Sequence, residues 1–163
     1  MFRDQGFTLI ALLPLLATGC DGLGGPSNLE QCSVGTQWTG GDEESPLMHP
    51  GGDCIACHGE GEGPRYVVAG TVMGAYDDET DCNGIEDVLV EITGADGAVT
   101  SLETNAAGNF FSNADIAVPY TVRLTLDGEI REMLADQTDT DCMSCHTPSG
   151  AEGAPGRILA PGF

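Results

Sequence analysis

The feature that most constrains this chain is a five-residue motif, C-x-x-C-H, that occurs twice. Its cysteines and histidine are Cys54, Cys57 and His58 in the first copy, and Cys142, Cys145 and His146 in the second. On a helical turn, positions i, i+3 and i+4 lie on one face, so each copy presents two thiols and an imidazole together. An aspartate precedes each copy, at Asp53 and Asp141, and we expect it to cap the exposed N–H groups of a short helix.

Two thiols followed by an imidazole at this spacing predict covalent attachment of haem c. The thiols form thioethers with the vinyl groups of one porphyrin, and the histidine becomes the proximal ligand of the iron. We therefore expect two haems, with His58 and His146 as iron ligands. One zinc ion held by the four thiolates is an alternative, but it does not explain why two of only three histidines directly follow the cysteine pairs. A thioredoxin-type dithiol needs a βαβ setting that this sequence lacks.

Each iron has a second axial position, and three residues are candidates for it. Met48 and His49 lie shortly before the first motif, and Met133 lies shortly before the second. We expect Met133 at one iron and either Met48 or His49 at the other, without assigning which haem each serves. The alternatives are that these methionines only fill space in the protein interior and that one iron is five-coordinate.

The N-terminal residues predict export. Residues 7–17 (FTLIALLPLLA) form an apolar run that is too short for a membrane-spanning helix of ~20 residues but fits the core of a signal peptide. Residues 16–20 (LATGC) resemble the lipobox of bacterial lipoproteins, which implies lipidation of Cys20 and a location on the periplasmic face of a membrane or on the cell surface. Residues 6–10 (GFTLI) also resemble a type IV pilin cleavage site, but no long apolar helix follows them.

The charge balance excludes several classes of function. The chain has no lysine, and its five arginines stand against 26 aspartates and glutamates, giving a net charge of −21. Nucleic-acid binding requires a basic face, and lysine-dependent chemistry requires a lysine. We expect redox partner proteins, cationic ones in particular, although such acidity is also typical of a merely well-solvated surface. Membrane contact is expected through the N-terminal lipid only, and a homo-oligomer or a haem-stacked assembly stays open.

Two cysteines are left over once the motifs and Cys20 are assigned. They are Cys32 and Cys82, and in an oxidising compartment we expect them to form a disulfide. The alternative is that they are unpaired or bond to another molecule.

The middle of the chain alternates like β-strands. Strand patterns cover residues 66–73, 88–92 and 120–126, and the last places Tyr120, Val122, Leu124 and Leu126 on one face. The dipeptides at residues 83–84, 96–97 and 127–128 (NG, DG and DG) are typical of tight hairpin turns. The pattern predicts a mainly β protein, with a small antiparallel β-sandwich flanked by two haem-binding segments of loop and short helix.

This region resembles the carboxypeptidase-regulatory-like domain family. The resemblance is carried by residues 68–72 (VAGTV), 84–90 (GIEDVLV), 104–110 (TNAAGNF) and 119–122 (PYTV). It implies a transthyretin-like sandwich that serves as a structural module without catalysis. The expected division of the chain is a signal peptide (1–19), a flexible tether (20–43), a first haem segment (44–64), the sandwich (65–135), and a second haem segment with a tail (136–163).

Together these features predict an exported, lipid-anchored dihaem c-type cytochrome that transfers electrons and is not itself an enzyme. One alternative is a haem enzyme such as a peroxidase. Another is a non-redox surface binding module with zinc in the cysteine motifs.

Overall fold

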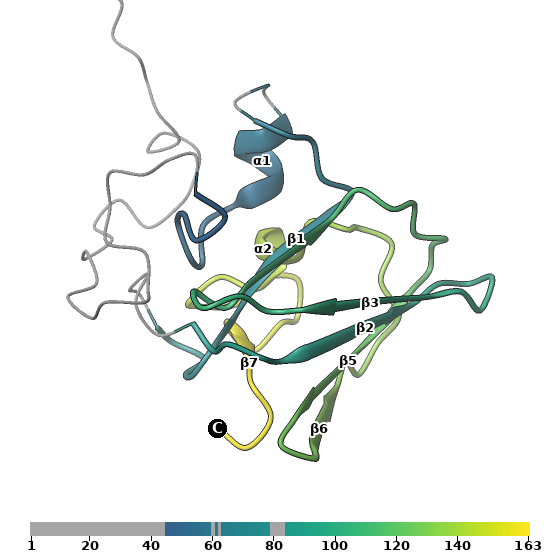
Figure 1. Ribbon diagram of the computed structural model, residues 1–163. Helices are drawn as coiled ribbons and strands as arrows, with labels where there is room; N and C mark the ends of the chain where they lie inside the picture. Colours follow the sequence, from purple (N-terminus) through teal and green to yellow (C-terminus); the bar gives the residue numbers. More distant parts are fainter. Residues whose placement is uncertain (1–44, 60, 62, 79–83) are drawn as a thin grey trace, which may run out of the picture.

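The computed structural model describes residues 45–163, except residues 60, 62 and 79–83. This part of the chain contains two short helices, α1 (Cys54–Gly59) and α2 (Cys142–Cys145), and both coincide with the cysteine motifs (Figure 1). The strands are β1 (Val68–Met73), β2 (Leu89–Thr93), β3 (Val99–Glu103), β4 (Asn109–Ser112), β5 (Thr121–Leu126), β6 (Glu129–Glu132) and β7 (Ile158–Leu159). The protein is therefore mainly β, as predicted.

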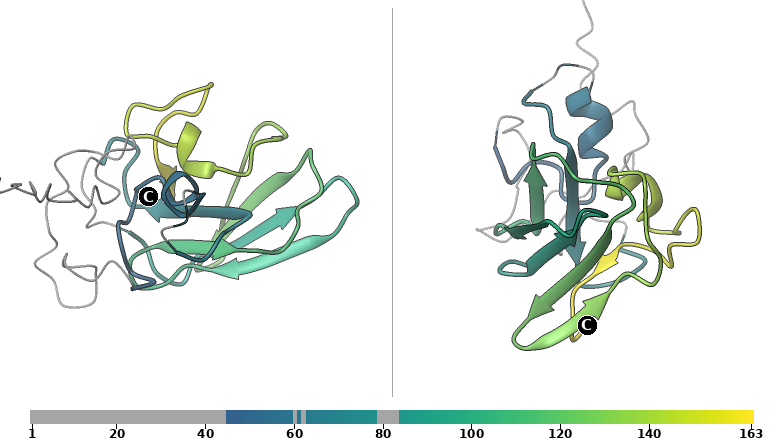
Figure 2. Two further views of the ribbon diagram at one scale, coloured as in Figure 1. Left: turned by 90° about the horizontal axis from the view of Figure 1, so that it is seen from above. Right: turned by 90° about the vertical axis from the view of Figure 1, so that its right-hand side faces the viewer.

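The strands form two sheets that pack together as a small β-sandwich (Figure 2). One sheet has the order β4-β1-β7 and the other the order β3-β2-β5-β6. Neighbouring strands are antiparallel, except that β7 pairs with β1 in parallel. Because β7 lies within residues 136–163, the segment expected to hold the second haem and the tail also supplies a strand to the sandwich.

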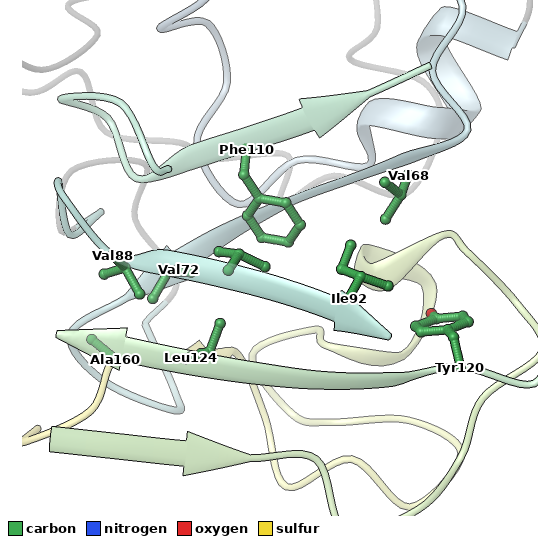
Figure 3. Close-up of a cluster of buried hydrophobic side chains, with 9 residues drawn as sticks. Val68, Val72, Val88, Ile92, Phe110, Tyr120, Leu124 and Ala160 are labelled. Carbon is green, nitrogen blue, oxygen red and sulfur yellow. The ribbon is translucent and has the colours of Figure 1, made fainter. Parts of the chain in front are cut away.

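The core lies between the two sheets, and the predicted alternation places its side chains there (Figure 3). In β5, Leu124 is buried while its neighbour Arg123 faces solvent, as the pattern predicted. Burying one such aliphatic side chain stabilises the folded state by about 1.5–3 kcal/mol. The cluster comprises Val68, Val72, Val88, Val90, Ile92, Phe110, Tyr120, Leu124 and Ala160.

Two of the three predicted turns close hairpins. Residues 96–97 join β2 to β3, and residues 127–128 join β5 to β6. The φ angles of Gly97, Asp127 and Gly128 are 80°, 52° and 83°, in the left-handed region that such turns require. Asparagine 83 of the third turn lies outside the described residues.

Strand β1 is buried along its whole length. On one face, Val68 and Val72 enter the core. On the other face, the hydroxyl of Thr71 accepts a hydrogen bond of 2.8 Å from the backbone N–H of Gly51, just upstream of α1. A strand covered on both faces needs apolar or small residues throughout, which the sequence VAGTVM supplies.

At Gly70, the Phe110 ring and Cys142 both lie very close to the backbone of β1. A Cβ atom at this position would lie 2.8 Å from the Phe110 ring and 3.1 Å from the Cβ of Cys142. Only a residue without a side chain lets the second cysteine motif and the core both reach β1 at this point.

We expect Gly70→Ala to destabilise the protein by about 1–3 kcal/mol, because the added methyl group overpacks the contact between β1, Phe110 and Cys142. Denaturant unfolding measures this loss. Gly59→Ala is the matched control, since a Cβ there meets no atom within 4 Å. Equal effects of the two substitutions would contradict the close contact.

Several predictions fall on residues that the structure does not describe. They concern the signal peptide and tether (residues 1–43), the lipid anchor at Cys20, and the disulfide between Cys32 and Cys82, and all of them stay predictions. No helix within the described residues is both long enough and apolar enough to cross a membrane.

Candidate functional site

Both motifs begin on capped helical turns, as predicted. The carboxylate of Asp53 accepts a hydrogen bond of 2.9 Å from the N–H of Ala56 in α1. In α2, the carboxylate of Asp141 accepts from the N–H groups of Met143 and Ser144, at 3.1 and 3.3 Å. Such caps are needed because a helix this short has no internal partners for its first N–H groups.

The two motifs, 88 positions apart in the sequence, lie side by side in the fold (Figures 1 and 2). The Asp53 and Asp141 side chains lie next to each other, close enough for Asp53 to raise the pKa of Asp141. Asp141 also forms a β-bridge with Ala69 of β1, and Cys142 packs against the core next to Gly70. The sandwich therefore brings the two motifs together on β1.

The leading thiol of each motif is partly buried and lies near negative charges. Burial, followed by the charges of Asp53 and Asp141, raises the pKa of Cys54 to about 12. Burial and the charge of Asp141 raise the pKa of Cys142 to about 12 as well. Dithiol redox sites rely on a thiol whose pKa is lowered, because the thiolate is the nucleophile. This environment therefore argues against a thioredoxin-type dithiol at either motif.

The imidazole of His146 is held in a defined orientation. Its Nδ1 lies 2.9 Å from the carbonyl oxygen of Gly156, and burial lowers its pKa. A neutral ring whose Nδ1–H donates to a carbonyl has its Nε2 lone pair available to a metal. This is the usual bracing of a metal-binding histidine.

The imidazole of His58 is held by packing. The ring is 8% exposed and lies 4.8 Å from the Tyr66 ring, which in turn lies 4.7 Å from Phe111. A Cβ at Gly63 would lie 2.7 Å from the imidazole, so the backbone at Gly63 lies against the ring. Its Nδ1 is buried without a hydrogen-bond partner among the described residues, which is rare for a polar atom that serves structure alone.

A cavity opens beside the second motif. Its volume is about 470 Å³, within the range of roughly 300–1,000 Å³ that small-molecule and cofactor pockets occupy. The core residues Phe110 and Leu124 form part of its wall. The chemically distinctive residues in the lining are Cys142, Cys145, His146, Met133, Arg131 and Arg157.

Of the three candidates for the distal iron position, the structure brings one to this cavity. Met133 lines it together with His146, and the backbone N–H of Met133 donates to the carbonyl of Val122 at 2.9 Å. Met48 and His49 do not line it; the carbonyl of Met48 accepts a hydrogen bond from Asn109 at 2.9 Å. The ligand assignments of all three stay predictions.

Sequence reasoning missed Arg157. Its side chain is 1% exposed, and it donates from Nε to the carbonyl of Asp78 at 3.0 Å and from Nη1 to the carbonyl of Gly51. It thus connects the chain after the second motif to the residues just before the first. The sequence offered one signal, the scarcity of basic residues, but scarcity does not reveal which arginine is buried.

Comparisons with protein-family models, curated proteins and solved structures found no match. Within the described residues, no three or more histidine, cysteine, aspartate or glutamate side chains are grouped as a metal site requires.

We expect the Asp53–Asp141 contact to make stability depend on pH. Burial, the charge of Asp53 and the shared hydrogen bond raise the pKa of Asp141 to about 6. The folded protein then holds this proton more tightly than the unfolded chain, in which the pKa is about 3.9. The contribution of Asp141 to the free energy of unfolding is therefore complete below about pH 4 and is lost as the pH rises through about 6.

Asp141→Asn keeps a capping side chain but removes this titration. From pH 4 to pH 7, urea unfolding should show the variant losing less stability than wild type. We expect a difference of about 1 kcal/mol, because partial exposure screens the interaction. Asp127→Asn, in the exposed β5–β6 turn, is the control and should follow wild type. Identical pH profiles for Asp141→Asn and wild type would contradict the shared proton.

Proposed function

We propose that this chain is an exported, lipid-anchored dihaem c-type cytochrome that passes electrons between redox partner proteins. The observation that carries the proposal is the pair of C-x-x-C-H motifs, each on an aspartate-capped turn and both docked at β1. At the second motif, the two cysteines and a braced histidine line a cavity of cofactor size.

The roles of the residues follow from this arrangement. When bound, haem c supplies one-electron exchange between ferric and ferrous iron. Cys54 with Cys57, and Cys142 with Cys145, would hold the two groups covalently. His58 and His146 would be the proximal ligands, and the Gly156 carbonyl would fix the orientation of the His146 ring. Apolar side chains such as Phe110 and Leu124 form part of the wall beside the second motif, and solvent access to the iron is a main determinant of potential in haem proteins.

The proximity of the two motifs supports electron exchange within the molecule. The Asp53 and Asp141 side chains lie next to each other, so the two attachment sites start from adjacent points of the fold. The net charge of −21 favours the ferric state, lowers both potentials and favours a cationic partner. Lipidation at Cys20 would hold so acidic a protein at a membrane.

A haem enzyme such as a peroxidase is the alternative to electron transfer. Among the described residues that line the cavity, His146 is the one histidine, and four carboxylates also line it: Glu132, Asp139, Asp141 and Glu152. A distal imidazole would therefore have to come from outside this lining.

The first test is haem content. Protein produced with a working haem-attachment system should carry the mass of two haem groups and give the pyridine haemochrome spectrum of haem c. The double variants Cys54→Ala/Cys57→Ala and Cys142→Ala/Cys145→Ala should each retain one haem. Bound zinc with no covalent porphyrin in the wild-type protein would refute the proposal.

The second test concerns Met133. If its thioether is the distal ligand at the second haem, Met133→Ala should abolish the sulfur-to-iron charge-transfer band of the ferric protein, and Met133→His should lower the potential. Met143→Leu is the control, because Met143 is a buried residue of α2 itself and does not line this cavity. An unchanged band in Met133→Ala would show that Met133 only packs against the core.

A further inference from the structure

The histidines of the two motifs are held in different ways. The Nδ1 of His146 lies 2.9 Å from the carbonyl oxygen of Gly156. Because a carbonyl only accepts hydrogen bonds, Nδ1 carries the proton of the neutral ring and Nε2 keeps a lone pair for iron. The Nδ1 of His58 is buried and has no hydrogen-bond partner among the described residues. A His58 ring that binds iron through Nε2 therefore carries an N–H at Nδ1 that meets no acceptor in that part of the chain.

Packing closes off the Nδ1 edge of His58. The side chain is 8% exposed, and a Cβ at Gly63 would lie 2.7 Å from both Nδ1 and Cε1 of the ring. The backbone of Gly63 thus lies against the edge of the ring that carries the unpaired nitrogen. The Tyr66 ring packs on the imidazole with its centroid 4.8 Å away. The first motif therefore fixes its histidine by contact, whereas the second fixes its histidine by a hydrogen bond.

The acceptor at the second motif is built into the fold. The peptide between Gly156 and Arg157 is held on both sides, because its carbonyl meets His146 and its N–H donates to the carbonyl of Tyr76 at 2.8 Å. The φ angle of Gly156 is 150°, and a Cβ there would lie 2.5 Å from the Tyr76 carbonyl oxygen. Glycine is required at this position, and its carbonyl is held in place for His146.

This difference has an electronic consequence. A hydrogen bond from Nδ1–H to a carbonyl gives the imidazole more anionic character, so its Nε2 becomes a stronger donor and favours ferric iron. A ring without such a bond is the weaker donor. The two motifs share other features of their surroundings: each begins on an aspartate-capped turn, and the charge of Asp141 acts on the leading thiols of both.

We propose that the two motifs differ in the donor strength of their histidines, and that Gly156 is the positioning residue that makes His146 the stronger donor. This inference rests on the proposed function. The hydrogen bond lowers the potential of the haem at the second motif, and His58 lacks the same effect at the first. The difference favours the one-electron step in which ferrous iron at the second motif is oxidised and ferric iron at the first is reduced. Electrons then enter at the second motif and leave from the first.

Gly156→Ala tests the role of the carbonyl, because the added Cβ must move this peptide away from Tyr76. We expect the ferric–ferrous equilibrium of the second haem to shift toward ferrous by about tenfold, or about 59 mV for a one-electron couple. The first haem should keep its potential. A site that was merely loosened would admit water, which favours the more highly charged ferric state and shifts the potential the other way.

Gly97→Ala is the matched control. Its φ angle of 80° is also positive, but it lies in the β2–β3 turn and a Cβ there meets no atom within 4 Å. This variant should leave both potentials unchanged. The distal ligands contribute to each potential as well, so each variant is compared with wild type at the same haem.

The test uses the full dihaem protein. Spectroelectrochemistry gives the two midpoint potentials, and the double variants Cys54→Ala/Cys57→Ala and Cys142→Ala/Cys145→Ala, with one haem each, assign them to a motif. NMR of reduced protein labelled with ¹⁵N in histidine shows whether each Nδ1–H is hydrogen-bonded. In wild type we expect a hydrogen-bonded Nδ1–H at His146 and an unbonded one at His58. In Gly156→Ala, the His146 signal should move toward that of His58.

The possible failures are distinguishable. Wild-type protein without covalent haem would refute the proposed function together with this inference. Equal hydrogen bonding at His58 and His146 in the dihaem protein would overturn this inference alone. So would a Gly156→Ala variant that carries two haems and whose second potential is unchanged or lowered. If Gly156→Ala does not fold, the Nδ1–H signals of wild type decide the question.

Discussion

The fold depends on the burial of one strand, β1, between the sandwich core and the segments that carry the cysteine motifs. Its apolar face contributes Val68 and Val72 to the core, and its other face is covered through the contact of Thr71 with Gly51. A central strand with both faces buried is fixed in register, because a slip by one residue would exchange the two faces. Both motifs dock on this strand, so the same constraint that stabilises the sandwich also fixes where the motifs lie.

The local structure around the motifs followed from the sequence, because it depends on short-range chemistry. Asp53 and Asp141 cap their turns as expected, since an aspartate just before a helix has its own backbone donors within reach. The hairpin turn at residues 127–128 and the buried Leu124 followed from turn preference and period-two alternation in the same way. The likeness to the carboxypeptidase-regulatory-like family stays a prediction, because a two-sheet sandwich can be built by unrelated chains.

The relation between the motifs could not be predicted, because it depends on contacts across most of the chain. No residue near Cys54 or Cys142 in the sequence indicates that both motifs pack against β1. Gly70 is one residue that permits this, and its role is visible only once Phe110 and Cys142 are seen on either side of it. The burial of Arg157 could not be predicted for a similar reason, since its hydrogen-bond partners Gly51 and Asp78 lie 106 and 79 positions away in the sequence.

The distribution of charge connects these observations. Folding places Asp53 against Asp141 and raises the pKa of both leading thiols, so the motifs meet in a strongly negative environment. Buried charges are tolerated only where opposite charges or several hydrogen-bond donors meet them, and this chain has five arginines against 26 acidic residues. One of the five, Arg157, is buried with hydrogen bonds to the carbonyls of Gly51 and Asp78, and it lines a small cavity together with Asp53. A scarce positive charge therefore lies beside the negatively charged region in which the two motifs meet.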